Sequence, residues 1–326
     1  MSVGRIQRWW WNFWWGPAHP GVPAALRIGL ATVAIWAHLS WWPEVDTLLD
    51  VEGQARNVVD WSVGRGYSVY SISGVTGDLA HVVHALGLVP LVALLVGFGG
   101  RWTSVLAWLV VLGWYQRVPG ASTGGDRLLR FGLLYLSTGH TTAAWSVDAW
   151  RRKTPSPSSV SRLPVRLIQV QWAAMYALSG LDKARGSTWR DGTALHYALS
   201  SRTFDRLDGL LHPILESTAW APILQAATVA VLVWELAFPA LVVFGRTRWI
   251  ALLVGIFVHV GIGVTMSVGP FTLVTLVGYL AFFDRWFPAE THGSVKGRSA
   301  THTHMQSSRP LDEHGAPNQS PPQELP

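Results

Sequence analysis

The chain has 326 residues, of which 49% are hydrophobic and only 13% are charged, and its formal net charge is +6. Its mean hydropathy of +0.26 argues against an ordinary soluble protein, and its apolar runs reach the length of about 20 residues that crosses a bilayer. The absence of cysteine excludes a disulfide framework, a thiolate zinc site and thiol redox chemistry.

The N-terminal stretch RIQRWWWNFWWGP (5–17) is too short to cross a membrane. Its two arginines and five tryptophans predict a helix that lies in the plane of the membrane interface. We therefore expect three parts: a Trp-rich interfacial segment over 1–20, a transmembrane domain over 21–288, and a disordered polar tail over 289–326.

The apolar runs that follow predict an all-α, polytopic membrane protein with about eight transmembrane helices. Tryptophan stands mainly near the ends of these runs, where its amphipathic ring favours the headgroup level. The spans are expected at roughly 24–42, 79–98, 102–117, 128–146, 165–183, 221–244, 248–268 and 270–287.

Lysine and arginine residues predict the orientation of these spans. Basic residues precede the first span and fill the loops after the fourth and sixth, so eight spans would collect them on one side with both termini. We expect that side to be the cytoplasm and the membrane to be the plasma membrane. Arg27, near the start of the first span, is expected to snorkel to the headgroups.

Two ionisable residues interrupt the sixth and seventh spans. Glu235 lies within VAVLVWELAFPALVVFG, and His259 lies within ALLVGIFVHVGIGVTM. Each is roughly 15 Å from the turn between these spans, so an antiparallel hairpin could pair the carboxylate with the imidazole at one depth. The pair would either lock two helices or handle protons. The other histidines, His81 and His84 among them, are not accompanied by acidic or thiolate residues that would complete a metal ligand set, and no metal site is expected.

Lys183 stands at the end of the fifth span, in YALSGLDKARGSTWRDG (176–192). The chain has 22 arginines and three lysines, and Lys183 is the only lysine of the transmembrane core. Arginine cannot release its proton at accessible pH, whereas a partly desolvated lysine can act as a base. A boundary anchor that pairs with Asp182 or Asp191 is the alternative.

At this point three segments resemble one family. QWAAMYALSGLDKARGSTWRDGTALHYAL (171–199), WELAFPALVVFGRTRWIALLVGIFVHVGIGVTM (234–266) and QRVPGASTGGDRLLR (116–130) are similar to the horizontally transferred transmembrane (HTTM) domain family. That family includes vitamin K-dependent gamma-carboxylase and a bacterial branch that acts in maturation of the sporulation-delaying peptide toxin.

The resemblance implies that Lys183 is a base facing outward, that Glu235 and His259 are the family's acid and histidine, and that a reduced quinone is the cofactor. Two departures argue against true glutamate carboxylation. Gly125 and Asp126 stand where the carboxylases carry Asn-His, and the large lumenal domain that grips their peptide substrate is replaced by a short polar tail.

We therefore expect a bacterial membrane protein that modifies or matures a secreted or membrane peptide at an outward-facing cavity. Lys183 would be the base, Asp126 an acidic partner, and Glu235 with His259 the polar pair at membrane depth. The expected partners are the lipid bilayer and a small secreted peptide, with no nucleic acid. The alternatives are a membrane chaperone or immunity-type component that binds a small toxin, and a proton-coupled transporter.

Overall fold

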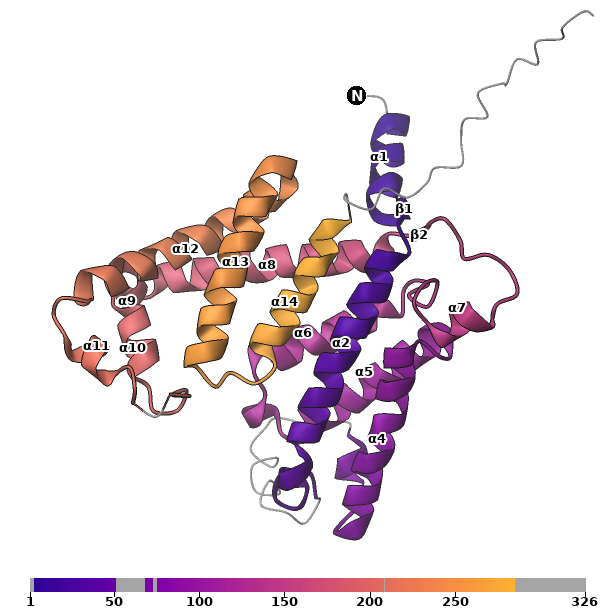
Figure 1. Cartoon of the computed structure of the whole chain (residues 1–326), viewed down its shortest axis with the longest axis horizontal. Coiled ribbons are helices and arrows are strands. Elements are labelled where there is room, and N and C mark those ends of the chain that lie inside the picture. Colours follow the sequence, from indigo (N-terminus) through magenta and orange to yellow (C-terminus); the bar gives the residue numbers. More distant parts are fainter. Residues whose placement is uncertain (1–2, 51–67, 73–74, 208, 285–326) are drawn as a thin grey trace, which may run out of the picture. The chain divides into compact units, whose positions relative to one another are not determined.

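The computed structural model describes residues 3–50, 68–72, 75–207 and 209–284, and this part of the chain is nearly all helical (Figure 1). The expected tail over 289–326 lies outside the described residues. The elements are α1 (Val3–Trp15), β1 (Pro17–Ala18), α2 (Gly21–Ser40), η1 (Trp42–Glu44), η2 (Val45–Leu49), η3 (Val69–Ser71), α4 (Asp78–Val96), α5 (Gly100–Arg117), η4 (Pro119–Ala121), α6 (Gly124–Leu136), α7 (Val147–Arg151), β2 (Val160–Ser161), α8 (Leu163–Arg185), α9 (Ser187–Arg190), α10 (Ala194–Ser200), α11 (His212–Glu216), α12 (Ala221–Val243), α13 (Gly245–Thr265), α14 (Phe271–Tyr279) and η5 (Leu280–Phe283).

Each of the eight expected spans contains a helix. Within the described residues, four helices are long and apolar enough to cross a membrane: α2 with its continuation to Leu49, α4, α12 and α13. The stretch Phe271–Phe283 is a shorter apolar helix. The prediction of a largely α-helical membrane fold is thereby confirmed.

The fourth expected span, 128–146, is wrong at its C-terminal end, because α6 stops at Leu136. The hydroxyls of Ser137 and Thr138 donate to the carbonyls of Leu134 and Tyr135, at 2.6 and 2.7 Å. Such local bonds compete with the helical ladder and favour a helix end. The chain then continues in turns as far as α7.

Helices α2 and α4 pack antiparallel, as the contacts at their ends demonstrate. α2 packs against α4 and α8 against α12, while α14 contacts α6, α2 and α13. Arg27, early in α2, binds the carbonyl of Leu94 near the end of α4, and His38, late in α2, binds the carbonyl of His84 near the start of α4. Successive helices of this pair therefore begin at opposite ends.

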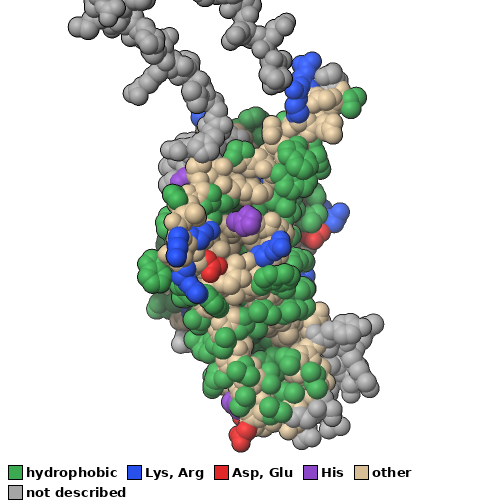
Figure 2. Space-filling view, turned by 90° about the vertical axis from the view of Figure 1, so that its right-hand side faces the viewer, with side chains coloured by type: hydrophobic (Ala, Val, Ile, Leu, Met, Phe, Trp, Pro, Cys, Tyr) green, Lys and Arg blue, Asp and Glu red, His purple; other side chains and the backbone are tan. Residues whose placement is uncertain are grey.

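The outward faces of these helices are apolar. On α4 the exposed large hydrophobic side chains recur every three or four residues, and α13 has a similar set. Figure 2 shows one face of the molecule, on which hydrophobic side chains cover most of the lower part and Lys and Arg gather higher up. A helix that is apolar outward suits contact with lipid. The α4 set is Leu79, Val82, Leu86, Val89, Val92 and Val96.

The expectation that Arg27 snorkels to the headgroups is wrong. Its side chain is fully buried and donates to the carbonyls of Leu94 and Trp145. Gly97, with a φ of 72°, makes room, since a Cβ there would overlap the Arg27 guanidinium. Arg27 thus binds the carbonyl of Leu94 in the last turn of α4, which also accepts from the N–H of Gly97, and the carbonyl of Trp145 in the turns before α7.

Candidate functional site

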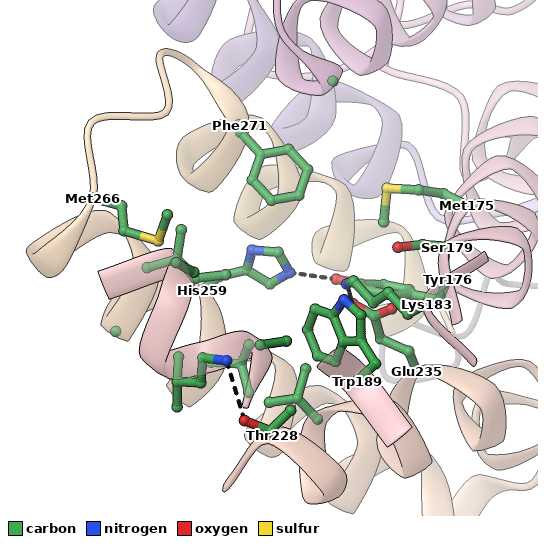
Figure 3. A pocket seen from close by; sticks show the side chains of 18 of the residues that line it. Met175, Tyr176, Ser179, Lys183, Trp189, Thr228, Glu235, His259, Met266 and Phe271 are labelled. Atoms are coloured by element: carbon green, nitrogen blue, oxygen red, sulfur yellow. Dashed lines mark hydrogen bonds and ion pairs between the residues drawn. The ribbon is translucent and has the colours of Figure 1, made fainter. Parts of the chain in front are cut away.

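A cavity of about 760 Å³ lies between α6, α8, α10, α12, α13 and the start of α14. Most of its lining is apolar, including Leu128, Phe131, Val231 and Phe257. Its ionisable side chains are few, and three of the four site residues predicted from the sequence converge here: Lys183, Glu235 and His259 (Figure 3).

Lys183 and Glu235 form an ion pair between α8 and α12, in which Nζ donates to Oε1. The Glu235 side chain is 8% exposed and that of Lys183 is 26% exposed. Gly180, one turn before Lys183, lets the two helices approach, because a Cβ there would meet Leu236 at 3.0 Å. The Trp189 ring covers the ammonium at 4.8 Å, within the range of a cation–π contact.

His259 binds a different partner. Its Nε2 is 2.7 Å from the Tyr176 hydroxyl, which also bonds the Tyr279 hydroxyl. Gly255, one turn before His259, is required here, since a Cβ would lie 2.2 Å from the Tyr279 hydroxyl. The predicted direct pair of Glu235 with His259 is wrong: the first binds Lys183 and the second binds Tyr176.

Two polar atoms of this cluster are buried without a hydrogen-bond partner within the described structure. They are Oε2 of Glu235 and Nδ1 of His259. Buried polar atoms are ordinarily satisfied, and an exception calls for an explanation such as a bound ligand or a catalytic role. Because both residues line the cavity, a molecule bound there could supply the missing partners.

Asp126 has a structural role at the start of α6. Its Oδ2 accepts from the backbone N and the hydroxyl of Thr123, at 2.7 and 2.9 Å, while the Thr123 hydroxyl caps the first turn of α6. This is a capping box, and Asp126 does not line the cavity. The expectation that it partners Lys183 is therefore wrong, and the spacing T-x-x-D was the signal for its role.

Sequence reasoning missed three aromatic members of the site: Tyr176, Trp189 and Tyr279. Tyr176 lies seven residues before Lys183 on α8, so helical periodicity places both on one face. The sequence holds no such signal for Tyr279, because its position depends on how α14 packs. Its neighbour Gly278 packs directly against Trp172 of α8.

Apolar helices with outward hydrophobic faces indicate a multi-pass membrane protein, and the cavity between its helices holds an ion pair. The HTTM domain family matches residues 75–286, and the chain belongs to that family.

The sporulation-delaying protein SdpB of Bacillus subtilis (strain 168) is similar to this chain, with 24% identity over 190 residues. The matched region is 55% of this chain and 56% of SdpB, so the similarity spans about half of each protein. No solved structure matches the chain.

Proposed function

We propose that this protein modifies or matures a secreted or membrane peptide, with Lys183 and Glu235 as the proton-handling pair. The observation that carries the proposal is an ion pair with a free carboxylate oxygen on the wall of an apolar cavity. Membership of the HTTM family and similarity to a sporulation-delaying protein support it.

The chemistry follows from the pair itself. While the ammonium and carboxylate are both charged, Lys183 has no free lone pair and only Glu235 can accept a proton. Transfer of the Lys183 proton to Glu235 removes both charges, which a low-dielectric cavity favours, and leaves a neutral amine that can act as a base. Glu235 is thus the group that converts Lys183 from cation to base.

A reduced quinone, implied by family resemblance, fits the chemistry of the cavity. Lys183, Glu235 and His259 would hold its hydroxyls, and the apolar wall would hold its ring and tail. Such a group supplies electrons and acidic hydroxyl protons when it is bound.

The eight-span topology, with both termini in the cytoplasm of a bacterial cell, is part of the proposal. It is supported by the alternation of helix ends, which puts Arg27 and the start of α8 at one end and Lys183 at the other. In this arrangement α1, with exposed Trp9, Trp10 and Trp11, lies in the interface.

Single cysteines test the orientation, because the chain has none of its own. With an impermeant thiol reagent applied to whole cells, Ser187→Cys should react and Ser156→Cys should not. Labelling of Ser156→Cys alone would reverse the orientation and place Lys183 on the cytoplasmic side.

Lys183→Arg tests the activity. Cells that lack the gene would receive the wild-type chain, Lys183→Arg or the control Arg185→Lys, and the peptides of the medium would be compared by mass spectrometry. Arginine preserves the charge but cannot become a base, so the peptide changes that depend on the protein should vanish with Lys183→Arg. They should persist with Arg185→Lys, which alters an exposed ion pair with Asp182.

The alternatives have different outcomes. Unchanged peptides with Lys183→Arg, at normal protein levels, would refute the base and favour a chaperone that only binds its peptide. A transporter would respond to Glu235→Gln more strongly than to any change at Lys183.

A further inference from the structure

One charged residue on the wall of the large cavity has no counter-charge there. The wall carries Arg127, Lys183 and Glu235, and the last two neutralise each other as an ion pair. Arg127 is exposed, and no carboxylate of the described residues lies within ion-pair distance of it. The cavity therefore presents a positive charge that no described part of the chain offsets.

A tyrosine fixes the direction of this guanidinium. Nε of Arg127 donates to the Tyr115 hydroxyl at 3.1 Å. The guanidinium of Arg130 covers the Tyr115 ring at 4.0 Å from its centroid, which holds the ring in place. Because Nε is engaged, the outer fork of Nη1 and Nη2 is the edge that Arg127 offers to a ligand. That fork matches the two oxygens of a carboxylate.

The helices that carry the arginine and the lysine run in opposite directions. The hydroxyl of Tyr135, late in α6, donates to Oε1 of Gln171 in the first half of α8 at 3.0 Å. Gly139, just after α6, packs against Pro164 at the start of α8. Residues further back along α6 therefore face residues further on along α8.

This register places Arg127 close to the depth of the ion pair. Arg127 precedes Tyr135 by the same number of residues as Ser179 follows Gln171, and both helices rise by 1.5 Å per residue. Arg127 is thus level with Ser179, which also lines the cavity and lies one turn before Lys183. A molecule in the cavity could contact Arg127 and the ion pair together.

The buried wall favours a peptide over a lipid as the carrier of the carboxylate. Among the described residues the Tyr279 hydroxyl bonds only Tyr176, so every proton is used when Tyr279 donates to Tyr176 and Tyr176 donates to Nε2 of His259. A neutral His259 ring then carries its proton on Nδ1, which lacks a partner, as does the acceptor Oε2 of Glu235. A ligand for this wall needs polar groups within an apolar body. Each amide of a peptide supplies them, whereas acyl chains have none.

We propose that Arg127 binds a carboxylate of an apolar peptide held in this cavity. The carboxylate is the C-terminal one or that of an acidic side chain, since both present the same two oxygens. The inference rests on the proposed function in taking a peptide as the occupant. Arg127 determines which peptides bind and takes no part in proton transfer at Lys183.

The test measures binding and not turnover. Three radiolabelled, N-acetylated pentapeptides of leucine and alanine would be dialysed to equilibrium against the full chain in an uncharged detergent, with protein-free detergent as the blank. One has a free C-terminal carboxylate, one has a C-terminal amide, and one has the amide and a central glutamate. Hydrogen bonds from an exposed guanidinium to a carboxylate contribute about tenfold in affinity. At least one acidic peptide should therefore bind about tenfold more tightly than the neutral one, and the tighter of the two identifies the source of the carboxylate.

Substitutions assign this preference to Arg127. Arg127→Gln should abolish it and leave binding of the neutral peptide unchanged. The control Arg202→Gln removes an exposed arginine outside the cavity lining and should retain it in full. Tyr115→Phe covers the case in which Arg127→Gln does not fold. It keeps the charge of Arg127 but releases the guanidinium, so the preference should fall about threefold.

Lys183→Arg separates this inference from the proposed base. It should keep the preference for an acidic peptide whether or not peptide maturation is lost, because carboxylate binding needs no deprotonated lysine. Equal binding, or no binding, of the acidic and neutral peptides by the wild-type chain would overturn the proposal, as would an equal loss in Arg202→Gln. Binding of dioleoyl phosphatidylglycerol that depends on Arg127, without any preference among the peptides, would assign the arginine to a lipid headgroup instead.

Discussion

The protein buries histidine in two places between apolar helices, and the two places differ in what the rings contact. In the first, between α2 and α4, Nε2 of His38 donates to the carbonyl of His84 at 2.7 Å, and Nε2 of His84 donates to that of His38 at 2.9 Å. The rings stack with centroids 3.8 Å apart. Burial raises the pKa of Tyr70, so its hydroxyl keeps its proton and donates to Nδ1 of His84 at 3.0 Å.

In the second place, His259 bonds only side chains, through the Tyr176 hydroxyl, and lines the large cavity beside Lys183 and Glu235. The first cluster joins two helices through backbone carbonyls, and His38 Nδ1 is its one side-chain atom without a partner among the described residues. The second leaves His259 Nδ1 and Glu235 Oε2 without partners, and both residues line a cavity. A buried ionisable residue in a membrane helix is thus a functional candidate when it faces a cavity. It has a structural role when it donates its hydrogen bonds to backbone carbonyls of the neighbouring helix.

The largest effect on stability is expected when the ion pair of Lys183 and Glu235 loses one of its two charges. Glu235→Gln leaves the Lys183 ammonium unpaired, which should cost about 3 kcal/mol, the low end for a buried pair because Lys183 is partly exposed. The double variant with Lys183→Met should recover most of this loss in thermal unfolding in detergent. An equal loss in the double variant would contradict the buried pair.

A substitution in the first cluster, formed by His38, His84 and Tyr70, should lower stability and leave activity unchanged. His84→Phe keeps the ring but removes one of the two donors to the His38 carbonyl and leaves the Tyr70 hydroxyl without its acceptor, at a cost of about 2 kcal/mol. Unfolding in detergent would measure the loss, and peptide output divided by membrane-inserted protein should equal that of the wild type. A drop in output per inserted molecule would assign function to this cluster too.

Tyr176→Phe should lower both stability and activity. The hydroxyl bridges His259 and Tyr279, and its removal should cost about 2 kcal/mol, while peptide output per inserted molecule falls because His259 loses its orientation. Tyr70→Phe is a matched control, since the Tyr70 hydroxyl bonds Nδ1 of His84 at 3.0 Å and lies outside the Lys183 cavity. Equal output from both variants would remove Tyr176 from the site.

The smallest effect is expected at Asp126. Asp126→Ala removes half of the capping box at α6, which should cost about 0.5–1 kcal/mol and leave peptide output intact. Thr123→Ala, which removes the other half, should lower the melting temperature by a similar amount. Loss of output at normal stability would return Asp126 to the catalytic residues.

The comparison also explains what the sequence could and could not predict. Hydropathy located the helices, and the rarity of lysine singled out Lys183. Equal depth suggested that Glu235 faces His259, but depth fixes only the height of a residue and not its direction around the helix. That direction is set by packing: Gly180 brings α8 against α12 at Leu236, and Glu235 consequently meets Lys183.

Buried Arg27 has a consequence for how the protein is made. Its acceptors, the carbonyls of Leu94 and Trp145, are synthesised long after Arg27 itself leaves the ribosome. Until then a guanidinium in the first membrane helix has no protein partner, at a cost of about 2.5–3.5 kcal/mol if it enters the bilayer centre. We therefore expect α2 to remain at the translocon or the lipid surface until α4 and Trp145 have emerged, so that the first membrane helix made is among the last to take its final position.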